Sequence, residues 1–472
     1  MRKPLQKFTN FANTLLPHET KYLLSIQQFN DSQRLDILKQ VDYNAYHIEQ
    51  FTPYNAAIDK RKYNHLQNWI KAQLDAIDVD QQFNWMLDME QKIMIDTIQM
   101  EEERALLKSI KNYQHAAFFF TKFYELVEHY RHFLLIRLRY ADHQLANDFL
   151  KKHRDIYLQN KEIHEKLHDA TLDIVEQYSG KTAESSQWEA WLTDVFYNEE
   201  LEGKIRYLAL VRLTFISYNY RKYDLLREKF DHLDEKFSQG IHYSKRLLLN
   251  YYNNRLMLHS HFREYDKAVY FGYLSVRTQN HDYLLYANNL CAVLLRLDRN
   301  QEALQLMRTA SPAAQKTKNF HNRVSFVAFF MEALNKNGMY SNAENYGNIF
   351  LKAHYKEVLQ YRWHLFFSVY LEAFLHQKQY EKLLKTAQKY RLQERDKSYR
   401  NNANYLPIIP LYIEVARFKE AYIQRKDFIQ VLQVYAEQYQ NDVNKHSAFK
   451  KLLDTLRTWL PELSGFFSEL KY

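Results

Sequence analysis

The sequence predicts an all-α fold built from antiparallel helical hairpins. The first observation is a shortage of glycine and proline, with seven of each among 472 residues. Average usage would supply roughly 33 glycines and 24 prolines, and sheet proteins need glycine at their tight turns. The second observation is helical periodicity along almost the whole chain, and the third is a recurring turn pattern. No proline lies between Pro53 and Pro312, so nothing in that stretch forces a helix to break.

Length and composition indicate several folding units in a reducing compartment. A chain of 472 residues, 46% of them hydrophobic, exceeds one ordinary core and is not disordered by composition. The single cysteine, Cys291, excludes an intrachain disulfide and a zinc site of several cysteines. The N-terminal segment lacks the apolar run of a secretory signal, and no stretch has 18 apolar residues. We therefore expect a cytoplasmic protein with no membrane partner.

One hairpin is clear from the residues 284–307. Leu290, Leu294 and Leu297 follow at spacings of four and three, which places them on one helical face. A polar turn over residues 298–300 interrupts them, and apolar helical spacing then resumes. This pattern predicts two antiparallel helices joined by three residues.

The hairpin that follows carries three signals for the start or end of a helix. Gly338 is expected to end a helix in the left-handed cap conformation. Ser341 stands three residues before Glu344, the pattern of a capping box for a new helix. Upstream, the pair Ser311-Pro312 is typical of an N-cap followed by proline at the first helical position.

The turn pattern recurs along the chain. Each copy has an aromatic or polar residue, two further residues and then a small or aliphatic residue, and these fourth positions lie 42, 35, 40, 40 and 48 residues apart. A hairpin that cannot bury its apolar face alone can bury it against neighbouring copies. The fourth positions are Leu226, Ala268, Ala303, Ala343, Leu383 and, in a weaker copy, Val431.

In these turns the chain resembles the tetratricopeptide (TPR) family. The glycine, tyrosine and alanine of that 34-residue repeat correspond to Gly338, Tyr340 and Ala343, while Tyr265 and Ala268 match two of the three. The family's tryptophan is absent here and the period is longer. The resemblance covers residues 245–352 most clearly and 205–440 more loosely. It implies a TPR-like α-solenoid of at least four hairpins, with no cofactor.

The predicted organisation has four parts. Residues 1–112 show no repeat and are expected to form an N-terminal helical domain or cap. Residues 113–204 are helical and are interpreted as divergent hairpins. The TPR-like array occupies 205–440, and residues 441–472 are expected to be capping helices around Pro461.

The resemblance also implies where a partner binds. In such arrays the first helix of each hairpin lines the concave surface, and polar side chains there can bond an extended peptide. The ordinary alternative is a solvated surface. The residues expected to be exposed on that surface are Asn250, Asn253, Asn288, Arg296, Glu332 and Lys336.

Residues 164–168 read HEKLH and match the HExxH spacing of zinc metallopeptidases. On a helix His164 and His168 would share one face and could hold zinc, with Glu165 as the base. The segment is polar throughout and has no assigned third ligand, with Glu184 and Glu189 merely at a possible distance. A solvated helix face is the interpretation we adopt, so no metal is expected.

Two further signals have simpler explanations. The run Gly180-Lys181-Thr182 lacks the earlier glycine of a phosphate-binding loop, because Val175 stands there. The 38 tyrosines and 30 phenylalanines could stack on nucleic-acid bases. Their helical spacing favours packing between helices instead, so nucleic acid is not the expected partner.

Charge is unevenly distributed around a net of +9. Residues 75–104 hold nine acids against two bases, while residues 382–400 hold seven bases against two acids. Lys382, Lys385 and Lys389 fall at spacings of three and four on one predicted helical face. We expect either a solvated face or an acidic docking partner: another protein, the 75–104 segment, or a second copy.

The function indicated by these patterns is that of a non-catalytic scaffold for a protein or peptide partner. The runner-up is a regulatory or sensor protein of TPR-like build in transcription or signalling. A zinc metallopeptidase acting through residues 164–168 is the minor alternative.

Overall fold

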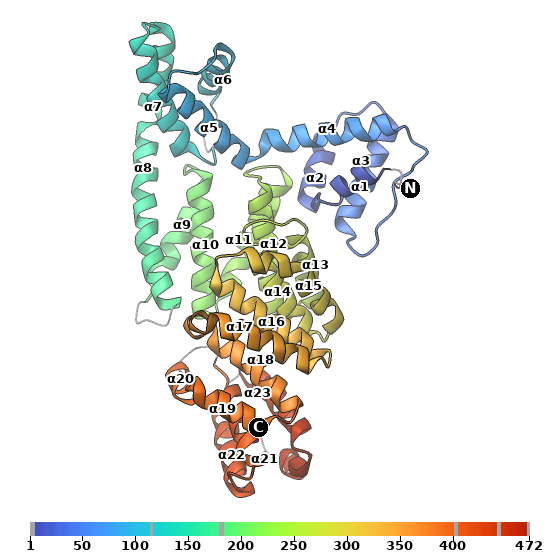
Figure 1. Cartoon of the computed structure of the whole chain (residues 1–472). Helices are drawn as coiled ribbons and strands as arrows, with labels where there is room; N and C mark the ends of the chain where they lie inside the picture. Colours follow the sequence, from blue (N-terminus) through green and yellow to red (C-terminus); the bar gives the residue numbers. More distant parts are fainter. Residues whose placement is uncertain (1–4, 114–116, 179–183, 401–404, 441–444, 470–472) are drawn as a thin grey trace. The chain divides into compact units, whose positions relative to one another are not determined.

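The computed structural model describes residues 5–113, 117–178, 184–400, 405–440 and 445–469. Within these ranges the chain is helical, with helices α1 to α24, two short 3₁₀ helices and no strand (Figure 1). The all-α prediction is therefore confirmed. The chain divides into two compact units, residues 1–278 and 279–472. This division lies within the 205–440 segment that the sequence predicts to be one array.

The N-terminal unit begins with six helices, three of which start at an aspartate that caps the first turn. The side chains of Asp31, Asp59 and Asp78 accept hydrogen bonds from the backbone N–H groups of the first turns of α3, α4 and α5. Such caps satisfy donors that the helix leaves without partners. The bounds are α1 Gln6–Ala12, α2 Pro17–Ile26, α3 Ser32–Tyr46, α4 Lys60–Ile77, α5 Val79–Met94 and α6 Met100–Lys111.

A long hairpin follows, formed by α7 (Phe120–Ile136) and α8 (Tyr140–Tyr178). Helix α5 packs on α7 and α6 packs on α8. Tyrosine and phenylalanine fill the core between them, with Phe120 and Tyr130 fully buried. Aromatic residues in this part of the chain therefore pack between helices, as their spacing predicts.

The rest of the N-terminal unit consists of shorter helices that pack on their neighbours. Helix α10 contacts α8, α9 and α11, and α12 packs along α13. The bounds are η1 Ser186–Trp188, α9 Glu189–Tyr197, α10 Gly203–Tyr220, α11 Asp224–Ser238, α12 Lys245–His261 and α13 Tyr265–Ser275.

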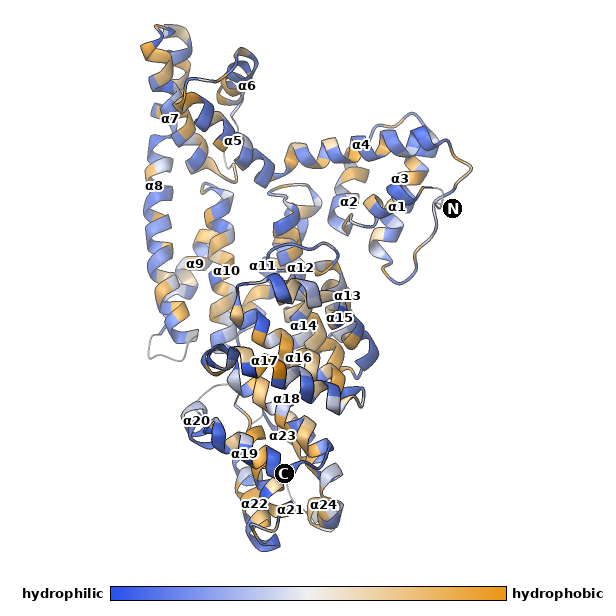
Figure 2. Ribbon diagram, viewed as in Figure 1, coloured by the Kyte–Doolittle hydropathy of each residue, from blue (hydrophilic) through white to orange (hydrophobic). Residues whose placement is uncertain are grey.

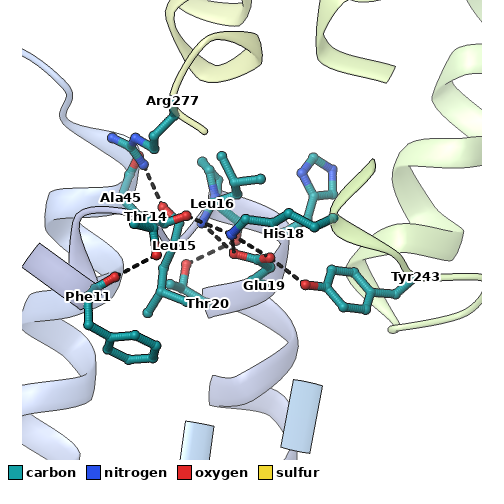
Figure 3. Close-up of polar contacts among 12 residues, drawn as sticks. Phe11, Thr14, Leu15, Leu16, His18, Glu19, Thr20, Ala45, Tyr243 and Arg277 are labelled. Carbon is teal, nitrogen blue, oxygen red and sulfur yellow. Dashed lines mark hydrogen bonds and ion pairs between the residues drawn. The ribbon is translucent and has the colours of Figure 1, made fainter. Parts of the chain in front are cut away.

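Buried polar contacts join α2 to the segment 243–277 (Figure 3). The side chain of Glu19 is fully buried and accepts hydrogen bonds from three donor groups. The donors are the Leu16 N–H at 2.7 Å, the Tyr243 hydroxyl at 2.5 Å and the Lys245 ammonium at 2.8 Å. Arg277 donates to two main-chain carbonyl groups of the N-terminal segment. Three donors on one carboxylate compensate for its burial.

His18 makes a second polar bridge beside Glu19. One ring nitrogen lies 2.7 Å from the Tyr252 hydroxyl and the other lies 3.0 Å from Asp234. Tyr251 also donates to Asp234, at 2.5 Å. Burial raises the pKa of Asp234, but the hydrogen bonds from His18 and Tyr251 outweigh it and lower the pKa to about 2.

In the C-terminal unit each helix packs on the next, and α16 also packs on both α14 and α18. Helix α14 contacts α15 and α16, α16 contacts α17 and α18, and α18 contacts α19 and α21. Figure 2 shows that these helices carry hydrophobic and hydrophilic residues on different sides. The bounds are α14 Tyr283–Arg296, α15 Asn300–Lys316, α16 Phe320–Lys336, α17 Tyr340–Gln360, α18 Trp363–His376, α19 Tyr380–Lys389, α20 Leu392–Tyr399, α21 Ile408–Lys419, α22 Arg425–Gln440, α23 His446–Trp459, η2 Pro461–Leu463 and α24 Ser464–Glu469.

The hairpin turns of this unit share one geometry. A residue with positive φ ends the first helix, as Asp298, Gly338 and Lys378 do. The next N–H donates to the carbonyl five residues earlier, at 3.0, 2.9 and 2.9 Å in these three turns, which is the Schellman closure. The left-handed cap at Gly338 is therefore confirmed, and the predicted three-residue turn is present one residue earlier, at 297–299.

Two local predictions are wrong. Helix α17 begins at Tyr340 and its N-cap is Met339 with no side-chain cap, so Ser341 does not form the expected capping box. Pro312 does not start a helix, because α15 runs through it from Asn300 to Lys316. Residues on both sides of Pro312 are buried, including Met307 and Ala314. We attribute the tolerance of proline to this packing, which outweighs one missing hydrogen bond.

Candidate functional site

Charged and polar side chains form a row along the first helices of the C-terminal hairpins. Glu332 of α16 and Glu372 of α18 each stand six residues before the left-handed residue of their turn. Four residues further along, and so one turn on, come Arg296, Lys336 and His376 in α14, α16 and α18. Because α16 packs on both α14 and α18, equal register brings these residues together. We call Arg296, Glu332, Lys336, Glu372 and His376 the charged row.

Glu332 has the most perturbed carboxyl group of the row. Desolvation by the surrounding protein, followed by repulsion from Glu372, raises its pKa to about 7, against the weaker opposing effect of Lys336 and Arg296. The residue is only half-buried by accessible surface, although the protein around it is as dense as an interior. It makes no ion pair with another described residue.

Glu372 is similarly short of cationic partners. The imidazole of His376, one turn away, lies 3.8 Å from the carboxylate, and the Glu372 side chain is 13% exposed. His376 stacks on Tyr340 at 4.2 Å between ring centroids, and the indole of Trp459 meets it edge-on at 5.2 Å. The imidazole is thereby held in place, while Glu372 keeps capacity for a further hydrogen-bond donor.

Tyr412 extends the row onto α21. Its ring meets Trp459 edge-on at 5.3 Å. Burial, then the charges of Glu372 and Glu332, raises its pKa well above the ordinary tyrosine value. The hydroxyl therefore stays protonated beside two carboxyl groups.

The three predicted asparagines are less available than expected. Asn253 is 5% exposed and Asn288 is 2% exposed, so the prediction that they are exposed is wrong. The Asn288 amide donates to the carbonyl of Asn322 on α16, at 3.0 Å. Asn250 is half-buried and accepts a hydrogen bond from the Tyr207 hydroxyl at 2.7 Å. These amides connect neighbouring helices, and Arg296, Glu332 and Lys336 are the predicted residues that reach the surface.

The basic segment 382–400 has internal partners. Lys382, Lys385 and Lys389 lie on α19, but a new helix starts at Leu392, so the seven bases do not share one helix. Lys382 bonds to Glu344, and Lys385 pairs with Glu381 at 2.8 Å. Lys389 lies over the ring of Tyr390 at 5.3 Å.

The acidic segment 75–104 is also largely paired. Six of its nine acids have ion pairs within the N-terminal unit, with Lys92, Lys122, His129, Arg137, Arg139 and Arg246 as the partners. The paired acids are Asp80, Asp88, Glu90, Asp96, Glu102 and Glu103. Mutual attraction between the two segments would have to compete with these contacts.

His164, Glu165 and His168 lie on α8, as the spacing predicts, and all three are exposed. Desolvation and nearby Lys204 lower the pKa of His164. Within the described ranges no third imidazole, thiolate or carboxylate joins the two histidines into a metal-binding group. Of the two suggested third ligands, Glu189 instead pairs with Lys222 at 3.2 Å.

Three remaining features do not contribute to the charged row. The Gly180-Lys181-Thr182 run lies outside the described residues. Cys291 is fully buried on α14, and burial raises the pKa of its thiol well above the ordinary value. A cavity in the N-terminal unit, lined by Arg206, His232 and Phe118 among others, has room for about one ordered water.

The sequence missed Glu372, His376 and Tyr412 as members of the site. Register was the available signal, because Glu372 stands 40 residues after Glu332 and His376 stands 40 residues after Lys336. Aligning the repeats by their turns places them at equal positions. What the sequence could not supply was the degree of desolvation, which depends on the packing of α14, α16 and α18.

Comparison with protein-family models, curated proteins and solved structures gives no match. No helix in the described part of the chain combines the length and apolar character that crossing a bilayer requires.

Proposed function

We propose that this chain is a non-catalytic protein-binding scaffold, a TPR-like array whose first helices receive an extended segment of a partner protein. The observation that carries this proposal is the charged row, in which two half-buried carboxyl groups from the neighbouring helices α16 and α18 lie beside each other without a strong cationic partner. Buried charges are ordinarily paired. A pair of acids left unpaired on adjacent helices is suited to receive a cation from outside.

The chemistry of the row favours a basic side chain as the ligand. A lysine ammonium or arginine guanidinium would supply donors to Glu332 and Glu372 and remove their repulsion. Arg296 and Lys336 lie one turn along the same helices and are exposed. They would suit an acidic side chain or a carboxylate further along the same segment. A short segment of alternating charge therefore fits the row, and an extended chain suits a surface that repeats from helix to helix.

The absence of catalysis is part of the proposal. It is supported by the position of His164, Glu165 and His168, which are exposed on one helix without a third ligand among the described residues. Metal analysis of the purified protein, with and without His164→Ala, tests this part. Stoichiometric zinc that is lost in the variant would support a metallopeptidase instead.

Peptide selection on the full-length protein tests the binding function. Random peptides displayed on phage are selected against the immobilised protein, and the enriched peptides are measured by fluorescence anisotropy. We expect enrichment of peptides that contain lysine or arginine. The double variant Glu332→Gln with Glu372→Gln should weaken their binding on the order of tenfold or more, because a desolvated charge pair is worth at least ~1.4 kcal/mol.

A peptide in which glutamine replaces the basic residue completes the test. It should bind the original protein weakly and should lose no further affinity in the double variant, since the pairwise interaction is already absent. Glu394→Gln is the matched control, because Glu394 is exposed on α20 and outside the row. If selected peptides bind the double variant and the original protein equally well, the charged row is not the binding surface.

A further inference from the structure

The small cavity of the N-terminal unit is lined by residues of α9, α10 and α11, among others. Helix α10 packs on both α9 and α11 (Figure 1). The polar side chains on the wall are Arg206, Tyr207, His232, Lys236 and His242, and the described residues that line it include no aspartate or glutamate. We call it the donor cavity.

Arg206 is a buried cation with little around it to neutralise its charge. The residue is 7% exposed, and its Nε donates to the main-chain carbonyl of Phe196 in the last turn of α9, at 3.0 Å. The carboxylate of Glu199 lies 3.8 Å from its Nη2, which is beyond hydrogen-bond distance. Burial lowers the pKa of Arg206, as it does for a desolvated cation. Because a guanidinium has five N–H donors, the contact with Phe196 accounts for only one of them.

The imidazole of His232 presents a second unused group. Its Nε2 atom is buried and has no hydrogen-bond partner in the described part of the chain. Phe196 and Tyr197 meet the ring edge-on, with centroids at 5.8 and 5.7 Å. Burial, followed by the charges of Lys236 and Arg206, lowers the pKa of His232. The ring is therefore neutral at pH 7 and can carry its proton on Nε2 as a donor.

Helix α11 turns a basic face toward the end of α9. Lys229, His232 and Lys236 follow at spacings of three and four, which places them on one side of the helix. The ammonium of Lys229 lies over the ring of Tyr197 at 5.7 Å and donates to the carbonyl of Leu225 at 3.0 Å. Lys229 is 6% exposed, and burial lowers its pKa. A second buried cation thus adds to the positive potential beside Arg206.

Glu199 stands at the margin of this positive region. Its carboxylate lies 2.8 Å from the ammonium of Lys236, and its side chain is 63% exposed. Lys236 is therefore already paired, whereas Arg206 and His232 are not paired at this distance. An ion pair with so exposed a carboxylate is worth little, so another anion can displace Glu199.

From these contacts we infer that the donor cavity is an anion-binding site that receives one oxygen atom of a phosphate or carboxylate group. An ordered water would have to donate hydrogen bonds as well as accept them, whereas an oxyanion only accepts, as the donors of Arg206 and His232 require. The cavity has room for about one ordered water, so a single oxygen enters and the rest of the group lies toward Lys236. This site is distinct from the charged row, which belongs to the other compact unit.

Hydrogen exchange of the amides in α10 and α11 tests the site in the full-length protein. Inorganic phosphate is titrated into sodium chloride at constant ionic strength, and sodium acetate in a second titration distinguishes a carboxylate from a phosphate. A ligand that binds only the folded state slows exchange by one plus the ratio of its concentration to its dissociation constant. We therefore expect exchange to slow about elevenfold at ten times the dissociation constant.

Three variants locate the effect. Arg206→Gln should raise the dissociation constant for phosphate on the order of tenfold or more, because the buried charge is lost. Lys236→Gln alters a residue at the cavity margin and should raise it about two- to fivefold, so the test does not depend on the folding of the Arg206 variant. Lys60→Gln is the matched control, because Lys60 is exposed on α4 and does not line the cavity.

Glu199→Gln should have the opposite effect. It removes the carboxylate that competes for the same cations, so phosphate should bind about two- to fivefold more tightly. A residue that only stabilised the fold would not produce this gain. Glu162→Gln removes the same charge from an exposed position on α8 and should leave the affinity unchanged.

Three outcomes would overturn the inference. In the first, neither phosphate nor acetate slows exchange more than sodium chloride of equal ionic strength, which would leave water as the occupant. In the second, phosphate slows exchange equally in the original protein, Arg206→Gln and Lys236→Gln, which is the general effect of phosphate on folded proteins. In the third, Glu199→Gln and Glu162→Gln strengthen binding equally, which would make net charge responsible.

Discussion

The carboxyl group of Glu332 should make the C-terminal unit less stable as pH rises. In the folded protein its pKa is raised from 4.5 to about 7, so the folded state holds a proton that the unfolded chain has released. The contribution of this group to the free energy of unfolding is therefore fully present below about pH 4.5. It falls as pH rises and becomes constant above about pH 7. The full difference corresponds to at most about 3 kcal/mol, and water that reaches the half-buried carboxyl group reduces it.

The substitution Glu332→Gln removes this dependence. Glutamine is neutral at every pH and similar in shape, so it cannot acquire the desolvated charge. We expect the variant to resemble the original protein near pH 5 and to be about 2–3 kcal/mol more stable near pH 8. A substitution that stabilises the fold while weakening partner binding is the behaviour expected of a residue kept for function.

Hydrogen exchange of the amides in α16 and α18 measures this effect locally. Comparing variants at the same pH cancels the intrinsic exchange rates, and a local readout avoids treating two compact units as one transition. Glu394→Gln is again the control, and its amide exchange in α16 and α18 should match that of the original protein at both pH values. The reasoning is refuted if Glu332→Gln exchanges faster than the original protein near pH 8, or if its effect is the same at both pH values.

Three further predictions concern packing and polar contacts. Replacing Glu19 with alanine leaves the buried donors of Tyr243 and Lys245 without their acceptor. Urea unfolding should therefore show that the free energy of unfolding of the N-terminal unit falls by about 3–5 kcal/mol. A decrease below about 1 kcal/mol would show that water replaces the carboxylate. In Gly347→Ala the new Cβ would lie 2.5 Å from the Met331 sulfur and 2.7 Å from the Tyr370 ring. Thermal unfolding should therefore show that the free energy of unfolding falls by about 1–3 kcal/mol. An unchanged midpoint temperature of unfolding would mean that both side chains move freely. The pKa of the Asp234 carboxyl group is lowered to about 2, so its carboxylate stabilises the fold above the ordinary aspartate pKa. That contribution should be lost as pH falls from about 4 to about 2. Over this window, circular dichroism should show that acid unfolds Asp234→Asn with a smaller pH dependence than the original protein.

Helical structure and the positions of the turns could be predicted because their causes are local. The spacing of Leu290 and Leu294 and the break predicted at residues 298–300 describe contacts within one hairpin. The structure confirms the two helices and places the break at 297–299. The cap at Gly338 follows from the conformational freedom of a single residue. The same geometry at Lys378 could not be read from that residue alone, because lysine does not favour the left-handed region.

The candidate site depended on tertiary structure to a much greater degree. Helical spacing placed Glu332 and Lys336 on one face, and the resemblance to TPR proteins implied a partner there. Only the packing of α14, α16 and α18 brings Glu372 close enough to raise the pKa of Glu332, because desolvation and repulsion depend on neighbours that are distant in sequence. The same reason explains why Asn253 and Asn288 were expected to be exposed and are buried. The sequence by itself determined where helices form and turn, because those preferences are local. The tertiary structure decided which polar groups are desolvated and which acids form ion pairs, because both depend on contacts between helices.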